Sequence, residues 1–349
     1  MKFCANLSFM FTEGSTIIER YGLAKEAGFR AVETGFPLGF TIEEVKRAQE
    51  NANIEQVLIN IKTGDVSKGE LGVTAIPGKE KQFKENLKET INYATALGAS
   101  KIHIMAGKLN TVTEVNWVVY ENNLRYAAEE LRECNKLGVI EPINQHSVPY
   151  YFLSDFKRAV DIIKRIGSEH LKLQLDIFHL QHICGDLSYN IKNLMPYVGH
   201  VQIAQVPSRN EPDTPGEINY EYILKTLESN GYTDWIGLEY KPAGNTNEGL
   251  KWINKYDKIP CTIGYMRWEL YINSQNFCIC LILFLTFKWW FPNKEFIQQH
   301  SNTPMVNRYI IHLPIDHFRR QIIKSSTHCF SPVIFINCLR KLNVIMTNF

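Results

Sequence analysis

Short apolar runs alternate with longer segments of helical periodicity through residues 1–257 of this 349-residue chain. In the longer segments apolar residues return every three or four positions, which is the spacing of an amphipathic helix. The apolar runs predict strands at 3–7, 29–35, 54–60, 101–106, 139–144, 171–176, 199–205 and 235–240. The segments between them predict helices at 15–27, 41–52, 79–97, 115–136, 154–166, 187–194, 220–229 and 246–254.

This order repeats one strand–helix unit eight times. Eight such units in about 250 residues are typical of a (β/α)8 TIM barrel. An open, doubly wound sheet is the alternative, but no G-x-G-x-x-G motif follows any predicted strand. We therefore predict a single α/β domain over residues 1–257, a TIM barrel in which all strands end at the same mouth.

Local signals mark several helix ends. Thr41, with Glu44 three positions later, forms a capping-box pattern. Ser154 is expected to cap the helix that follows it, because its hydroxyl can accept a hydrogen bond from a free backbone N–H. Gly28 stands where a left-handed residue commonly follows a helix. The glycine-containing segment 65–78 is long for an α/β connection, and such loops often cover a site.

The periodicity stops after Lys258. Residues 277–287 form an apolar stretch of eleven residues that Lys288 interrupts, whereas a membrane helix needs about 20. We therefore do not expect a membrane anchor. Residues 258–349 are predicted to be an atypical C-terminal extension without a recognisable domain, poorly ordered or forming weak helices.

Charge and cysteine content limit the partners and the compartment. The extension carries 10 Lys and Arg against 3 Asp and Glu, so residues 1–257 are net negative although the whole chain is +2. An acidic barrel argues against nucleic acid as a partner, since that would require a basic patch. Three widely spaced cysteines in residues 1–257 and no presequence at the N-terminus predict a reducing compartment, the cytoplasm. Homo-oligomerisation is left open.

Polar side chains with oxygen ligands recur at the ends of four predicted strands. Glu141 follows VI, Asp176 closes LKLQLD, Gln202 lies in HVQIAQ, and Glu239 follows WIGL. A buried carboxylate must be compensated by a cation or by hydrogen bonds. Each residue alone could cap a helix or pair with an arginine. All four on strands five to eight of one barrel are expected to converge at its mouth.

Three carboxylates and one amide oxygen form a site suited to a hard divalent cation, Mg²⁺ or alternatively Mn²⁺. Such an ion would relieve repulsion between the acids and polarise a substrate carbonyl. An α-hydroxy carbonyl compound could bind through both of its oxygens. Glu141 and Glu239 could then move a proton between adjacent carbons through an enediolate.

Three further residues are candidates for substrate binding. His179 lies three positions after Asp176 and so points at the same mouth, unless it only caps or packs. His103, in KIHIMAG, fits a core histidine as well as a site donor. Arg209, in PSRNEPD, is either a solvated charge or a clamp for a substrate carboxylate. Asn6 and Asn60 end two further strands and are weaker candidates.

Several blocks of sequence resemble the hydroxypyruvate isomerases of the xylose isomerase-like TIM barrel superfamily. They are VLINIKTGDVSKGELGVTAIPG (57–78), KIHIMAG, LQLDIFHLQ, GHVQIAQVPSRNEPDTPGEINY (199–220) and GYTDWIGLEYKPAGNTNEGLKW (231–252). The resemblance covers residues 1–257 and stops where members of the family normally end.

The resemblance implies reversible conversion of 3-hydroxypyruvate into 2-hydroxy-3-oxopropanoate (tartronate semialdehyde), a reaction of glyoxylate metabolism. It implies that Glu141 and Glu239 are the catalytic pair and that His179 and Arg209 contact substrate. Related epimerases carry histidine where this chain has Gln202, and loss of that nitrogen ligand favours Mg²⁺. The superfamily's metal ligands correspond to Glu141, Asp176, Gln202 and Glu239.

Three alternatives remain at this stage. A ketose 3-epimerase would use the same barrel on a larger sugar. A DNA repair nuclease of the endonuclease IV type would need several histidine ligands and a basic groove, which residues 1–257 lack. The extension could also turn the chain into a non-catalytic isoform.

Overall fold

The protein is described by a computed structural model that covers residues 1–64, 69–256, 266–271, 280–282 and 308–313. The chain divides into two compact units, Met1–Asp257 and Lys258–Phe349.

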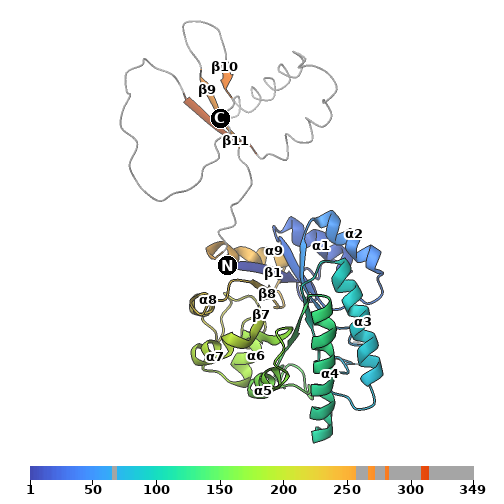
Figure 1. Ribbon diagram of the computed structural model, residues 1–349. Helices are drawn as coiled ribbons and strands as arrows, with labels where there is room; N and C mark the ends of the chain where they lie inside the picture. Colours follow the sequence, from blue (N-terminus) through green and yellow to red (C-terminus); the bar gives the residue numbers. More distant parts are fainter. Residues whose placement is uncertain (65–68, 257–265, 272–279, 283–307, 314–349) are drawn as a thin grey trace. The chain divides into compact units, whose positions relative to one another are not determined.

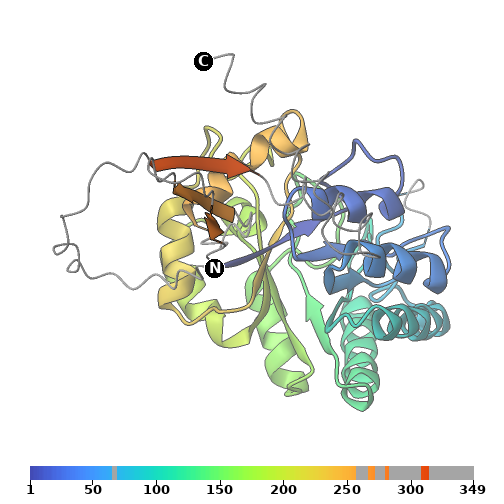
Figure 2. The same cartoon turned by 90° about the horizontal axis from the view of Figure 1, so that it is seen from above.

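The first unit is a closed barrel of parallel strands in sequential order, with β8 paired to β1 (Figure 1). A closed ring has no edge strand, so the prediction of a TIM barrel is confirmed and the open sheet is excluded for this unit. Helices surround the strands (Figure 2). The strands are β1 (Lys2–Asn6), β2 (Ala31–Thr34), β3 (Glu55–Asn60), β4 (Lys101–His103), β5 (Leu137–Ile140), β6 (Leu171–Asp176), β7 (Val198–Ile203) and β8 (Trp235–Leu238).

Most helices lie where the periodicity predicts them. Thr41 and Glu44 form the predicted capping box of α2. The prediction that Ser154 caps the helix that follows it is wrong. The cap of α5 is the next residue, Asp155, whose carboxylate accepts a hydrogen bond from the Arg158 N–H at 2.9 Å. The helices are α1 (Ile17–Glu26), α2 (Ile42–Ala52), α3 (Glu80–Ala96), α4 (Glu114–Glu133), α5 (Phe156–Ile166), α6 (Ile177–Ile183), α7 (Leu187–Leu194), α8 (Tyr220–Ser229) and α9 (Thr246–Gly249), with 3-10 turns η2 (Met195–Tyr197) and η3 (Leu250–Lys255).

The short helix α6 was not predicted. It starts directly after β6, since Asp176 both ends the strand and caps the helix by accepting the Phe178 N–H at 2.8 Å. This places His179 on the first turn of a helix that rises from the barrel mouth.

The barrel interior has an apolar and a polar level. Alternate residues of a barrel strand face inward. Cys4, Ala31, Val57, Leu58 and Val139 form a separate apolar cluster, distinct from the large core between strands and helices. Two positions further along their strands stand buried polar residues, among them Asn6, Glu33 and Glu141. The polar level therefore lies toward the carboxyl ends of the strands.

In the second unit β9 (Met266–Tyr271), β10 (Cys280–Ile282) and β11 (Arg308–Leu313) form an antiparallel sheet in the order β10-β9-β11. The sequence predicted no strands there. Most of the expected poorly ordered extension, including the apolar stretch 277–287 except for Cys280–Ile282, lies outside the described residues. Within the described part of the chain, no helix has the length and apolar character needed to cross a membrane.

Candidate active site

Three acidic side chains and one imidazole meet at the carboxyl ends of β5, β6 and β8. One ligand atom from each lies within 4.8 Å of the others. All four residues are buried. We call this set, formed by Glu141, Asp176, His179 and Glu239, the mouth cluster.

Strand ends position the three acids of the mouth cluster. β5 and β8 are shorter than predicted, so Glu141 and Glu239 are the first residues after their strands. Asp176 is the last residue of β6. Because its Oδ1 caps α6, its Oδ2 turns toward the cluster and has no hydrogen-bond partner among the described residues.

His179 faces the acids as a neutral donor. Its Nδ1 accepts the backbone N–H of Asn144 at 3.2 Å, so the proton of the neutral ring belongs on Nε2. Nε2 lies 3.6 Å from Asp176 Oδ2 and 3.7 Å from Glu141 Oε1. Burial, with the nearby Arg209 charge, holds the pKa of His179 well below its ordinary value. These contacts favour donation to an oxygen over ligation of a cation by Nε2.

Arg209 supplies the positive charge of the site. Its Nη2 pairs with the Glu239 carboxylate and lies 3.6 Å from Asp176 Oδ2. The guanidinium carbon lies 4.6 Å from the Phe9 ring centre and 4.9 Å from that of Phe178. Burial alone would lower the pKa of Arg209, but the neighbouring carboxylates outweigh it and raise the pKa above its ordinary value.

The loop after β7 is tied down so that Arg209 points inward. Arg209 has a φ of 56°, its N–H donates to the Gln205 carbonyl at 2.7 Å, and its carbonyl accepts the Lys241 N–H at 2.7 Å. The Gln205 side chain in turn donates to three backbone carbonyls of the same loop, those of Pro212, Thr214 and Ile218.

The acids of the mouth cluster are hard to ionise together. Burial, followed by the charges of Glu239 and Asp176, raises the pKa of Glu141 well above its ordinary value. Burial raises the pKa of Asp176 to about 6 and that of Glu239 to about 8, although Arg209 acts in the opposite direction on both. A bound cation would remove this penalty.

Gln202 and His103 join the cluster through Gln174. The Gln174 Nε2 donates to Gln202 Oε1 at 2.7 Å and to Glu141 Oε2 at 3.0 Å. His103 ends β4, and its Nε2 lies 3.5 Å from Glu141 Oε2. Burial lowers the pKa of His103 to about 3, so the ring is neutral. The structure thus brings together all seven candidate residues from the sequence, whose roles remain proposals.

Two buried acid oxygens of the mouth cluster are free to bind a divalent cation. Glu141 Oε1 and Asp176 Oδ2 are both buried and lack partners in the described part of the chain. Native proteins rarely leave such atoms unpaired without a ligand, water or ion. An oxygen-rich set of this kind is compatible with a divalent cation.

Sequence reasoning missed the level below the cluster. Glu33 and Gln174 are fully buried inside the barrel, and Asn6, a weak candidate, donates to Glu239 Oε1 at 3.2 Å. Their signal was a polar residue inside an apolar strand run, at or within two positions of the strand end. The Asn60 side chain, in contrast, donates to the Met105 sulfur at 3.7 Å.

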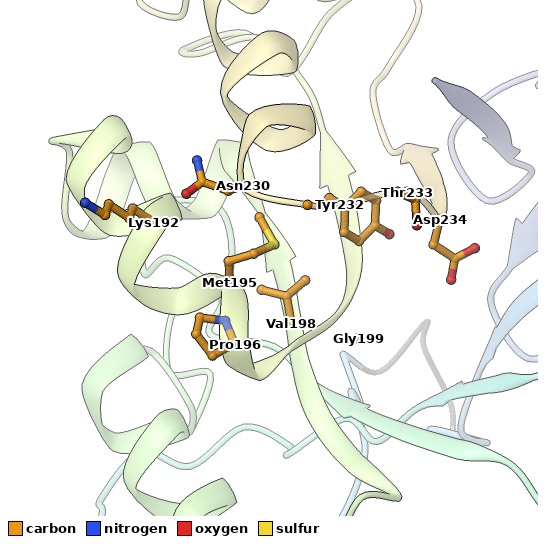
Figure 3. Close-up of a pocket in the computed structure, with 10 residues that line it drawn as sticks. Lys192, Met195, Pro196, Val198, Gly199, Asn230, Tyr232, Thr233 and Asp234 are labelled. Atoms are coloured by element: carbon orange, nitrogen blue, oxygen red, sulfur yellow. The ribbon is translucent and has the colours of Figure 1, made fainter.

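A pocket at the opposite end of the barrel is unrelated to these residues. Figure 3 shows it between the N-terminal ends of β7 and β8, with Val198 and Asp234 among its lining residues. Parallel strands place these residues at the mouth away from Asp176 and Glu239.

Comparison with known proteins gives the class. Residues 21–256 match the family model described as xylose isomerase-like TIM barrel. The chain therefore belongs to this family, as the sequence resemblance indicated.

Proteins of similar sequence indicate the group within this family to which the chain belongs. The chain is 39% identical over 258 residues to the hydroxypyruvate isomerase of Escherichia coli (strain K12), covering 73% of this chain and 99% of that protein. It thus falls among the hydroxypyruvate isomerases. It is also 37% identical over 257 residues to the 2-oxo-tetronate isomerase of Cupriavidus necator, covering 73% of this chain and 98% of the relative.

A solved structure from Brucella melitensis shares the fold. It is 40% identical, has a TM-score of 0.71, and matches over 74% of this chain and 99% of its own. The protein in that structure is named AP endonuclease, family 2.

Proposed function

We propose that the chain interconverts 3-hydroxypyruvate and 2-hydroxy-3-oxopropanoate. The observation that carries this proposal is the mouth cluster, in which the two buried glutamates lie within 4.8 Å of Asp176, and the Glu141 Oε1 and Asp176 Oδ2 atoms have no hydrogen-bond partner among the described residues. The membership among hydroxypyruvate isomerases supports the choice of substrate.

The residues that would hold a divalent cation, Mg²⁺ or Mn²⁺, are Glu141, Asp176, Gln202 and Glu239. When bound, the ion would act as a Lewis acid that polarises the substrate carbonyl. Gln202 presents its amide oxygen on the Gln174 side, since its Nε2 donates to Glu33 Oε1 at 2.7 Å.

Isomerisation needs one proton to leave C3 and one to arrive at C2. One glutamate of the pair Glu141 and Glu239 removes the C3 proton, which leaves an enediolate. The other glutamate delivers a proton to C2, while a hydroxyl proton passes from O3 to O2, so the product has an aldehyde at C3 and a hydroxyl at C2. Both carboxyl groups are within the same 4.8 Å cluster, which suits transfer between adjacent carbons.

Three residues orient the substrate. Arg209 is the buried cation available to pair with the substrate carboxylate, and its fork geometry matches that group. The Nε2–H of His179 and the neutral ring of His103 are positioned to donate to substrate oxygens.

The first test measures turnover of hydroxypyruvate by the full-length protein, followed by proton NMR with and without EDTA. We expect conversion that EDTA abolishes and Mg²⁺ or Mn²⁺ restores. The same assay with 2-oxo-tetronate and D-psicose separates the isomerase from its near alternatives. Faster turnover of either compound than of hydroxypyruvate would overturn the substrate assignment.

The nuclease name of the Brucella structure calls for its own test. Among the described residues, the mouth cluster contains one histidine and three acids, and the only cation it contacts is Arg209. We therefore propose no nucleic acid partner. Cleavage of a duplex carrying an abasic site would contradict this.

The partner is thus proposed to be a small hydroxy-carbonyl acid. We also propose a cytoplasmic location, since Cys4, Cys134 and Cys184 are free thiols in the described part of the chain. Sedimentation of the purified protein would decide between a monomer and a homo-oligomer.

A further inference from the structure

A second buried carboxylate lies below the mouth cluster and takes no part in the proposed chemistry. Glu33, on β2, has no exposed surface. Its Oε1 accepts from the side-chain amides of Asn6 at 2.8 Å and Gln202 at 2.7 Å. Its Oε2 lies 2.6 Å from His200 Nε2 and 3.7 Å from the Cys4 sulfur. Both oxygens therefore face donors.

Two of these donors reach the candidate metal ligands. Asn6 Nδ2 donates to Glu33 and also to Glu239 Oε1, at 3.2 Å. The side-chain N–H of Gln202 donates to Glu33, so the amide oxygen of Gln202 faces the opposite way and accepts from Gln174. An amide has one donor end and one acceptor end, so anchoring the donor end fixes where the oxygen points.

The backbone makes room for Glu33. A Cβ atom at Gly237, on β8, would lie 2.4 Å from both carboxylate oxygens of Glu33. Glycine at position 237 therefore leaves this space free for the Glu33 carboxylate. Cys4, Glu33 and His200 could in principle hold an ion of their own, but the His200–Glu33 hydrogen bond already satisfies the groups that would bind it.

We propose that Glu33 is a positioning residue, an acceptor that orients Asn6 and Gln202 so that Glu239 and the Gln202 oxygen are set to bind the divalent cation. This inference rests on the proposed metal centre. Partners of this kind commonly change metal affinity by 10- to 100-fold when they are removed.

Two substitutions of Glu33 distinguish its role as a hydrogen-bond acceptor from a role in packing alone. Glu33→Leu removes both acceptor oxygens, and we expect the dissociation constant of Mn²⁺ to rise at least about tenfold. Glu33→Gln should restore most of the affinity. Its oxygen can face Asn6 and Gln202 while its NH₂ faces His200, which can move its ring proton to Nδ1, an atom without a partner among the described residues.

The measurement is the EPR signal of free Mn²⁺ in a titration of the metal-free full chain, with thermal unfolding as a check of folding. Cys4→Ala is the matched control, because Cys4 is as buried as Glu33 and donates to its Oε2, and among the described residues it makes no side-chain hydrogen bond to Asn6 or Gln202. We expect this variant to bind Mn²⁺ as the wild type does.

Unchanged Mn²⁺ binding in Glu33→Leu, equal loss in Glu33→Leu and Glu33→Gln, or equal loss in Cys4→Ala would each overturn the proposal. If Glu33→Leu does not fold, Asn6→Ala must weaken Mn²⁺ binding for the proposal to stand. A wild-type chain that binds no Mn²⁺ would overturn both this proposal and the metal role above. A chain that binds Mn²⁺ but does not convert hydroxypyruvate would overturn only the proposed function.

Discussion

Asp176 on β6 and Gln202 on β7 are register partners, so an acid and an amide leave adjacent strands at the same height. Strand pairing, rather than a loop, sets their separation. Asp176 is additionally held by capping α6 and Gln202 by its hydrogen bond to Glu33. Two of the four residues proposed to bind the cation are therefore held in position before the cation binds, which is the preorganisation that a metal site requires.

This relationship makes position 202 a test of metal preference. Gln202→His replaces an amide oxygen with an imidazole nitrogen, which suits Co²⁺ and Zn²⁺ better than Mg²⁺. We expect the affinity for Co²⁺ relative to Mg²⁺ to rise at least about tenfold, because the softer nitrogen ligand favours Co²⁺ and disfavours Mg²⁺. Competition titrations would measure it. Gln181→His on the outer part of α6 is the control, and an unchanged ratio at position 202 would argue against ligation by Gln202.

Removal of either glutamate should stop the reaction without unfolding the barrel. Glu239→Gln and Glu141→Gln each take away a proton-transfer group, and such groups contribute about 10²- to 10⁴-fold to rate. Turnover of hydroxypyruvate measures the loss. In D₂O, the variant that retains the C3 base should still exchange the C3 protons, which assigns the two roles. The exposed Glu217→Gln is the control, and full activity in Glu239→Gln would refute the proton-transfer role.

Arg209 should not tolerate lysine. The guanidinium packs between the Phe9 and Phe178 rings while Nη2 reaches Glu239, and an ammonium group cannot make both contacts. We expect Arg209→Lys to raise KM for hydroxypyruvate at least about tenfold, because a lost charge-assisted hydrogen bond costs about 1.5–3 kcal/mol. Steady-state kinetics at saturating Mg²⁺ would show it. A KM equal to that of the wild type would place the substrate carboxylate elsewhere.

The mouth cluster was predictable because strand ends carry a direct sequence signal. An acid directly after an apolar run, as at Glu141 and Glu239, is visible in any reading of the pattern. The level below was hidden by the same alternation that predicted the strands. Gln174 alternates with leucines, as a solvent-facing residue would, yet it is fully buried. In a barrel both faces of a strand are covered, so the alternation of apolar and polar residues does not show which face is exposed to solvent.

Helix α6 and the α5 cap were missed for local reasons. IFHLQHI follows β6 without a break, and nothing in the pattern separates a strand from a helix that shares its terminal residue. At α5, Ser154 and Asp155 are both good caps, and only the observed bond from Arg158 decides between them. Long-range contacts such as Asn6 with Glu239 depend on barrel closure, which no local pattern contains.

The barrel unit should function without the extension. Met1–Asp257 forms its own compact unit, and the described site residues all lie within it. A protein ending at Asp257 should fold and keep kcat/KM within about twofold of the full chain, as expected of an independent domain. Parallel assays of both proteins would check this. Loss of activity only in the full chain would instead favour a non-catalytic isoform.

The metal-free protein should lose stability as pH rises from 7 to 9. The pKa of Glu239 is about 8 in the folded chain against an ordinary value of 4.5, and that of Glu141 is also well above it. In this window the folded state therefore binds more protons than the unfolded state, so the free energy of unfolding falls with pH and levels off above the folded pKa. His103 and His179, whose pKa values are lowered, are neutral in both states above about pH 7 and do not offset the trend. Glu239 alone should account for about 1.4 kcal/mol between pH 7 and 9.

Urea unfolding in EDTA at the two pH values measures this difference. Mg²⁺ should stabilise the protein more at pH 9 than at pH 7, because the ion binds the ionised acids. Glu239→Gln should show a smaller loss in EDTA, since the titrating group is gone, whereas the exposed Glu217→Gln should behave as the wild type. A metal-free protein that loses no stability between pH 7 and 9 would show that the acids of the mouth cluster are already ionised at pH 7 without a cation, and the electrostatic case for the metal would fail.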